Sequence, residues 1–339
     1  MRLHRNKYES IVLFFMILAA FILQSPSAIA GDTPDASFLF KLSTFSGVIP
    51  YAMPKIYVDG PRNEVYVIST TDSSVGIYNQ SGMETYRFTN DSFNYDSGSS
   101  PEYFSDATVD ADGNIVLLIY TLNPNNQMSY GVELCNYRGD KIKKIEIKGL
   151  PEKFSKIFPT RLKYRDGLFY LADLNTMRLI VIDEEGVYKD GYELPLLMGL
   201  DKKDNKGRDK MGDVGMVDFS IDKDGSILFT SPVLGLAYSV SPDRQVTSFG
   251  RRGSAPGRFG VPSAIVADAK GNYYVADTLR CVVIVFDKDK NFVTEFGGRG
   301  YLPGNFIGPK MLAIDNKDRV YISQLANRGV SVYQLTWNN

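Results

Sequence analysis

The chain has 339 residues and a formal net charge of −1, with the apolar content of an ordinary globular protein. This charge balance gives no concentrated basic surface, so we expect no nucleic-acid binding. Its one histidine is His4, which excludes a Ser-His-Asp or Cys-His nucleophile, a histidine-ligated zinc and a C-x-x-C-H haem site from the rest of the chain.

Residues 1–30 have the pattern of a secretory signal peptide. Arg2, Arg5 and Lys7 form a basic start, residues 11–23 are apolar, and small residues occupy 27–30. The apolar run is shorter than the roughly 20 residues that a spanning helix needs. We therefore predict cleavage after Ala30 and export of residues 31–339 to the periplasm or the extracellular space, with no membrane-spanning segment left. The alternative is that the segment is kept as an anchor.

The remaining chain repeats one pattern. Residues 38–46 have the pattern of an apolar strand, with Gly47 completing a Phe45-Ser46-Gly47 ending, and six similar units follow. In each unit a polar turn containing Asp separates two apolar runs, and we expect two-residue hairpins wherever Asp-Gly supplies φ > 0. The turns begin near Asp59, Asp110, Asp166, Asp222, Asp268 and Asp315.

The last two units are the clearest copies. Phe249-Gly250 and Phe296-Gly297 are each followed by a Pro-Gly pair, a phenylalanine, and a proline that opens an apolar strand. At these residues the chain resembles the NHL-repeat family, and the resemblance extends over nearly all of residues 31–339. It implies an all-β, six-bladed β-propeller of four-stranded antiparallel blades that acts as a recognition platform.

The ring of blades must close, and the sequence indicates how. The last unit stops at Leu335, after its third strand, with too few residues left for a fourth. Residues 38–46 have the spacing of the fourth strand seen at 291–297. We therefore predict that the N-terminal strand pairs with the last blade.

The resemblance also implies which side chains face the central channel, because alternate residues of each first strand point toward it. This alignment places Asp106, Arg161 and Asp218 in one layer on three successive blades, with Lys163 and Ser220 beside them. The implied pairs are Ile56 and Val58, Asp106 and Thr108, Arg161 and Lys163, Asp218 and Ser220, Ala264 and Val266, and Met311 and Ala313.

Two interpretations of this charged layer remain open. Asp106, Arg161, Lys163, Asp218 and Ser220 could bind a polar or zwitterionic ligand, or the charges could neutralise one another and simply fill the channel. We expect a binding or scaffolding protein without catalysis or cofactor, acting as a monomer on a protein partner or a small polar ligand. The alternatives are a structural part of an envelope complex and a calcium-dependent lactonase or esterase, although Arg161 places a cation where the metal would sit.

Two further features carry expectations. Cys135 and Cys281 fall on units across the ring from each other, too far apart for a disulfide, so we expect buried free thiols.

The longest insertions, at 90–102 and 188–213, could form a partner-binding rim. The carboxylates between Asp201 and Asp209 are interleaved with cations, which favours a solvated loop over a calcium site.

Overall fold

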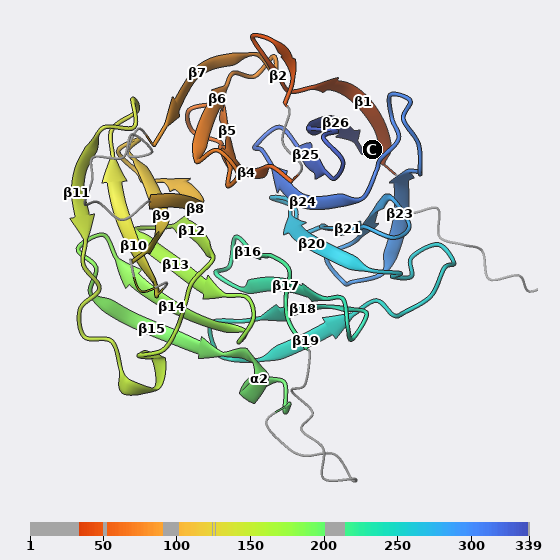
Figure 1. Cartoon of the computed structure of the whole chain (residues 1–339). Helices are drawn as coiled ribbons and strands as arrows, with labels where there is room; N and C mark the ends of the chain where they lie inside the picture. Colours follow the sequence, from red (N-terminus) through yellow and green to blue (C-terminus); the bar gives the residue numbers. More distant parts are fainter. Residues whose placement is uncertain are drawn as a thin grey trace, which may run out of the picture.

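The computed structural model describes residues 34–49, 53–90, 102–123, 125, 127–200 and 214–337. These residues form six four-stranded antiparallel sheets arranged as blades around a central axis (Figure 1). The fold is therefore the predicted six-bladed propeller. The predicted signal peptide lies outside the described residues, as do residues 91–101 and 201–213 of the two predicted insertions. Residues 188–193, predicted as part of the second insertion, instead form an outer strand of the third blade. Within the described ranges no helix is long and apolar enough to cross a membrane.

The strands follow the chain from the inner to the outer edge of each blade. The first blade consists of β4 (Lys55–Asp59), β5 (Glu64–Ser69), β6 (Ser74–Tyr78) and β7 (Glu84–Thr89). The second consists of β8 (Glu102–Val109), β9 (Ile115–Leu122), β10 (Met128–Cys135) and β11 (Lys141–Ile145). The third consists of β12 (Arg161–Arg165), β13 (Leu168–Asp173), β14 (Arg178–Asp183) and β15 (Tyr188–Glu193). Blades four and five are β16 (Phe219–Ile221), β17 (Ile227–Ser231), β18 (Leu236–Val240) and β19 (Val246–Phe249); and β20 (Pro262–Ala267), β21 (Tyr273–Asp277), β22 (Val282–Phe286) and β23 (Phe292–Gly297).

The sixth blade combines both ends of the described chain. It contains β24 (Pro309–Ile314), β25 (Arg319–Gln324) and β26 (Val330–Thr336), with β1 (Asp35–Lys41) as its outermost strand. β1 runs antiparallel to β26, with Phe38 opposite Tyr333. The prediction of closure through the N-terminal strand is confirmed, although the strand covers 35–41 rather than 38–46. The remaining short elements are β2 (Ser43–Thr44), β3 (Gly47–Val48), the 3-10 turn η2 (Glu152–Phe154) and α2 (Leu194–Leu197).

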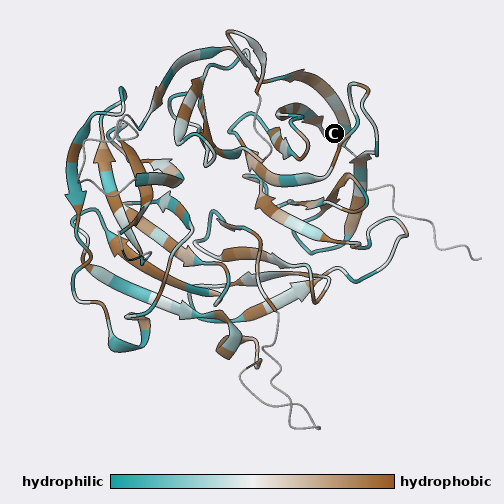
Figure 2. Ribbon diagram, viewed as in Figure 1, coloured by the Kyte–Doolittle hydropathy of each residue, from teal (hydrophilic) through white to brown (hydrophobic). Residues whose placement is uncertain are grey.

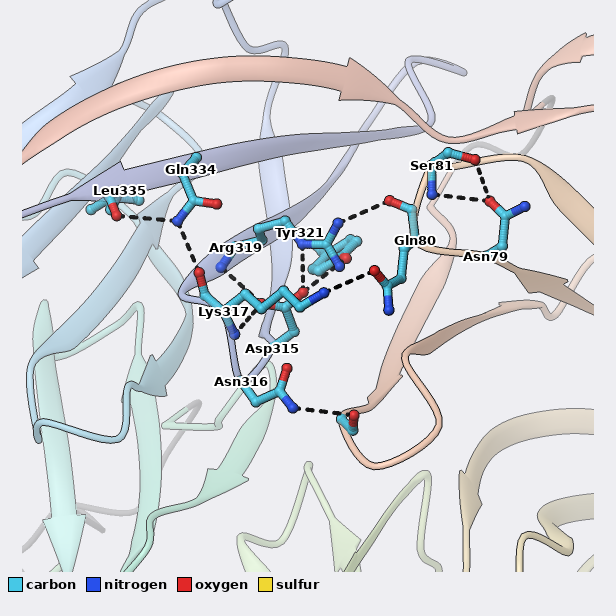
Figure 3. A network of polar contacts seen from close by, with 11 residues as sticks. Asn79, Gln80, Ser81, Asp315, Asn316, Lys317, Arg319, Tyr321, Gln334 and Leu335 are labelled. Carbon is cyan, nitrogen blue, oxygen red and sulfur yellow. Dashed lines mark hydrogen bonds and ion pairs between the residues drawn. The ribbon is translucent and has the colours of Figure 1, made fainter.

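A polar seam joins the sixth blade to the first (Figure 3). Lys317, in the β24–β25 turn, donates to the side-chain oxygen of Gln80 at 2.9 Å. Arg319, which follows that turn, donates to the backbone oxygen of Gln80 at 2.9 Å. Asn316 donates to the backbone oxygen of Gly60. These bonds hold the turns of the two blades together above the apolar core between them.

Hydrophobic side chains fill the spaces between blades. The middle strands β21 and β22 are buried along their whole length, whereas the outer strand β11 is exposed at four of its five positions. Figure 2 shows the same contrast, with much brown in the middle strands and a largely teal β11. Because both faces of each blade are covered by neighbours, the middle strands read as continuous apolar runs.

The hairpin prediction was right for one blade and wrong for others. Asp166 and Gly167, at φ 50° and 77°, form a two-residue turn between Arg165 and Leu168. In the second blade, Val109 pairs with Ile115, which leaves a five-residue loop. There the Asp110 carboxylate accepts the Asn114 backbone N–H at 2.8 Å and the Asn114 side chain at 3.0 Å. The aspartate thus closes the turn through its side chain.

Candidate functional site: the central channel

The inner strands β4, β8, β12, β16, β20 and β24 surround the propeller axis (Figure 1). Their side chains form two layers along the channel. The first layer is nearly closed to solvent, since Asp106, Arg161 and Asp218 are 2%, 7% and 5% exposed. The second layer opens into a pocket at the end where the inner strands finish.

The first layer contains a buried ion pair between neighbouring blades. Arg161 Nε lies 3.2 Å from Asp218 Oδ1, and Arg161 Nη1 donates to the Thr160 backbone oxygen at 3.1 Å. Arg161 Nη2 lies 4.0 Å from the sulfur of Met311, on the opposite blade. The arginine side chain therefore reaches across the axis and helps to close the channel.

Asp106 is held by backbone groups rather than by Arg161. One carboxylate oxygen accepts the N–H of Ala107 at 3.1 Å, and the other accepts the N–H of Leu162 on the next blade at 3.0 Å. Buried carboxylates need such donors to offset the loss of water. The predicted layer of three side chains exists, and its contacts favour a structural plug.

Lys55 is a fourth charged member of this layer that the sequence alignment missed. Its Nζ atom donates to the backbone oxygen of Ser105 and, at 3.4 Å, to that of Thr160. Burial, followed by the positive charge of Arg161, lowers the pKa of Lys55 from 10.5 to about 7, although Asp106 and Asp218 oppose this shift. Lysine, aspartate, arginine and aspartate thus alternate on the first four blades.

The alignment failed here because it was one residue out of register in the first unit. Counting back four residues from Asp110 gives Asp106, and the same count from Asp59 gives Lys55. Asp59 is therefore equivalent to Asp110, although it also pairs with Glu64 in the sheet. Val58, not Asp59, is then equivalent to the residue before the second turn, Val109. Lys55 and Tyr57, rather than Ile56 and Val58, are consequently equivalent to Asp106 and Thr108. Ile56 and Val58 pack in the core between the first and sixth blades.

Lys163 and Ser220 lie in the wall of the open pocket. Ser220 Oγ donates to the backbone oxygen of Ile265 at 2.7 Å. Lys163 is half-buried and, within the described chain, has neither a hydrogen-bond acceptor nor a carboxylate within 4 Å. The cavity measures about 180 Å³. Its lining consists of Ile56, Tyr57, Val58, Lys163, Tyr164, Arg165, Phe219, Ser220, Ile221, Val266, Ala267, Leu312, Ala313 and Ile314.

The other charged and phenolic groups around this pocket already have partners. Tyr164 donates to Glu184 at 2.7 Å, and burial followed by that carboxylate raises the pKa of Tyr164 to about 12. Arg165 binds Asp166 at 3.1 Å and the backbone oxygen of Lys223 at 2.6 Å. Lys163 is therefore the cation that remains available to a ligand in this wall.

The two cysteines are free and buried, as predicted. Cys135 packs between the first and second blades, and Cys281 between the fifth and sixth. Burial, reinforced by the charge of Glu133, raises the pKa of the Cys135 thiol to about 12. A thiol with so high a pKa is a poor nucleophile, which places Cys135 in the core rather than in a site.

No family model matches the chain, and no curated protein matches its sequence. Among solved structures, the chain is similar to a streptogramin B lyase, with a TM-score of 0.55 and 13% identity over 89% of this chain and 98% of that one. A protein of unknown function from Bacteroides thetaiotaomicron gives a TM-score of 0.57 and 13% identity over 89% of this chain and 76% of that one.

A third similar structure is a catalytically inactive histidine-to-alanine variant of virginiamycin B lyase from Staphylococcus aureus with quinupristin. It gives a TM-score of 0.54 and 12% identity over 89% of this chain and all of that one. At such identities the likeness shows the fold alone. The chain is a six-bladed β-propeller whose structural neighbours include lyases and proteins of unknown function.

Proposed function

We propose that this protein is a binding propeller that takes up a small anionic ligand at the open pocket of its channel. The observation that carries the proposal is Lys163, a half-buried cation that has no partner among the described residues. A partly desolvated ammonium group gains most from an anion that replaces its lost water. The buried charged layer of Asp106, Arg161 and Asp218 lies beneath this pocket and forms its floor.

The pocket walls indicate the rest of the ligand. Val266, Ala313 and Ile314 form an apolar side. The Ser220 hydroxyl donates its proton to Ile265, so its oxygen can only accept a hydrogen bond, and the anion would bind to Lys163. The volume of about 180 Å³ lies below the roughly 300–1,000 Å³ of drug-sized sites. We infer that the ligand is a small carboxylate or phosphate compound with a short apolar portion, or one acidic side chain of a partner protein.

Catalysis is not part of the proposal. The virginiamycin B lyase variant that lost one histidine is catalytically inactive, and this chain carries its one histidine at position 4, within the predicted signal peptide. We therefore do not extend that reaction to this chain. We further propose that residues 31–339 are exported and act as a monomer in the periplasm or outside the cell.

A pair of isosteric compounds tests the proposal. Benzoate and inorganic phosphate should raise the melting temperature of the protein saturably, whereas benzamide, which lacks the charge, should not. Lys163→Met should weaken benzoate or phosphate binding in calorimetry about tenfold or more, the loss typical of a charged hydrogen bond. Lys310→Met, at the other end of the channel, is the matched control. The proposal fails if neither anion binds or if both variants bind as wild type does.

Calcium provides a separate test of the alternative hydrolase function. A calcium site needs several oxygen ligands that converge on one ion. In the described ranges, no cluster of three or more acidic, histidine or cysteine side chains could hold a metal ion. We therefore expect the wild-type melting temperature to be the same with calcium and with chelator. A clear saturable rise with calcium would contradict the binding-only proposal.

A further inference from the structure

The face of the propeller where the inner strands begin carries a concentration of arginine. Successive strands alternate in direction, so the turns between second and third strands and the connections between blades lie on this face. Over the fourth to sixth blades these segments are 232–235, 250–261, 278–281, 298–308 and 325–329. They contain no Asp or Glu but six arginines, which we call the arginine face: Arg251, Arg252, Arg258, Arg280, Arg299 and Arg328.

The opposite turns of the same blades do not share this bias. They combine both signs, as in Asp222-Lys223 and Asp287-Lys288. Since the whole chain has a net charge of −1, the arginine face is not a consequence of a basic composition. It is a local segregation of charge.

Three of these arginines are held by backbone oxygens, which leaves their charge unneutralised. Arg252 donates to Val233 at 2.6 Å, Arg299 to Leu279 at 2.9 Å and Arg328 to Tyr301 at 2.8 Å. Arg280, in contrast, forms a 2.5 Å ion pair with Glu295. The carbonyl bonds fix the guanidinium groups at the surface before any partner arrives.

The residues that supply those carbonyls also expose large apolar side chains. Val233, Leu279 and Tyr301 are 52%, 56% and 72% exposed, and Leu302 beside Tyr301 is 71% exposed. The Arg328 guanidinium lies 5.1 Å from the centre of the Tyr301 ring. Each fixed cation is thus next to an exposed apolar group, an arrangement repeated on three successive blades.

We propose that the arginine face docks an acidic segment of a partner protein. Guanidinium groups bind carboxylates in a bidentate manner, and arginine and tyrosine are enriched among the residues that dominate protein interfaces. Holding the arginines in place before binding lowers the conformational entropy that association costs. Apolar side chains of the same segment would cover Leu279 and Tyr301.

A protein partner fits these observations better than an anionic membrane. Because β1 runs antiparallel to β26, the described chain enters β1 at Asp35 on the opposite face. An N-terminal anchor, if retained, would attach the protein from that side and not from the arginine face. The two proposed sites also lie at opposite ends of the channel, so either proposal can fail without the other.

Fluorescence anisotropy with two labelled peptides tests the docking proposal. The probes are polyglutamate and the same peptide with leucines at intervals. Both should bind in a salt-dependent manner, the leucine-containing peptide more tightly. Arg252→Gln with Arg299→Gln should weaken binding about tenfold, the effect of one important interface contact. The matched control, Lys223→Gln with Lys288→Gln, removes equal charge from the opposite turns and should bind as wild type does.

A second variant separates docking from folding. Tyr301→Ser changes an exposed ring and should remove the preference for the leucine-containing peptide, with an unchanged melting temperature. The proposal is overturned if neither peptide binds, if the arginine variant binds as the control does, or if Tyr301→Ser keeps the full preference. Tighter, arginine-dependent binding to phosphatidylglycerol vesicles than to either peptide would also overturn it, in favour of a membrane.

Discussion

Arg161 and Asp218 form an ion pair across the boundary between the third and fourth blades, with side chains that are 8% and 7% exposed. A pair so deeply buried is costly to break, because removal of one partner leaves the other charged and without water. The contact of Arg161 with Met311 extends the same side chain to the opposite blade. One residue thus connects three of the six blades.

Removal of this arginine should destabilise the protein strongly. We expect Arg161→Met to lower the free energy of unfolding by about 3–5 kcal/mol at neutral pH, measured by urea denaturation. Arg161→Met combined with Asp218→Leu should recover a large part of the loss. If the double variant instead loses the sum of the single losses, the two charges are not coupled as the structure indicates.

The sequence predicted three members of this layer although their hairpins differ in length, since Arg161 precedes a two-residue turn. Val109 pairs with Ile115 and Ile221 with Ile227 around equal five-residue loops. Counting back from those turns therefore placed Asp106 and Asp218 correctly. The same count of four residues from Asp59 gives Lys55, but the alignment used Ile56, and a one-residue shift exchanges the two faces of a strand. Lys55 was therefore predictable from the sequence and was missed through the register alone.

Other features of the channel could not be predicted from the sequence, because they depend on contacts between residues that are remote in the chain. The repeat pattern gives the direction of Arg161 but not its reach across the axis to Met311. Likewise, Lys163 and Arg165 are alternate residues of one strand, yet Arg165 finds acceptors while Lys163 does not. Which cation is left for a ligand depends on neighbours that are remote in sequence. Local patterns carry no information on such contacts.

Closure of the ring gives a second prediction. Deletion of residues 31–47 removes β1 and exposes the edge of β26, together with the face of Tyr333 that Phe38 covers at a ring-centre distance of 5.6 Å. Unpaired strand edges promote association. We expect the truncated protein to elute as aggregates in size-exclusion chromatography and to melt at a lower temperature. A monomer that melts like the full-length chain would show that the sixth blade does not need its fourth strand.

Lys55 gives the last prediction, which concerns pH. Burial, together with Arg161, lowers the pKa of Lys55 to about 7 in the folded protein, against 10.5 for an ordinary lysine. Between these two values the unfolded chain binds a proton that the folded chain has released, so this group makes stability rise with pH across that window. Lys55→Met lacks the titration. The unfolding free energy of wild type should therefore increase relative to that of Lys55→Met between pH 7 and 10, by roughly 1 kcal/mol per pH unit.

Urea denaturation of both proteins at several pH values measures the difference, with Lys223→Met, a change at an exposed lysine, as control. A difference that does not change with pH would mean that Lys55 stays protonated in the channel and that its two backbone acceptors, with Asp106 and Asp218, compensate fully for its burial.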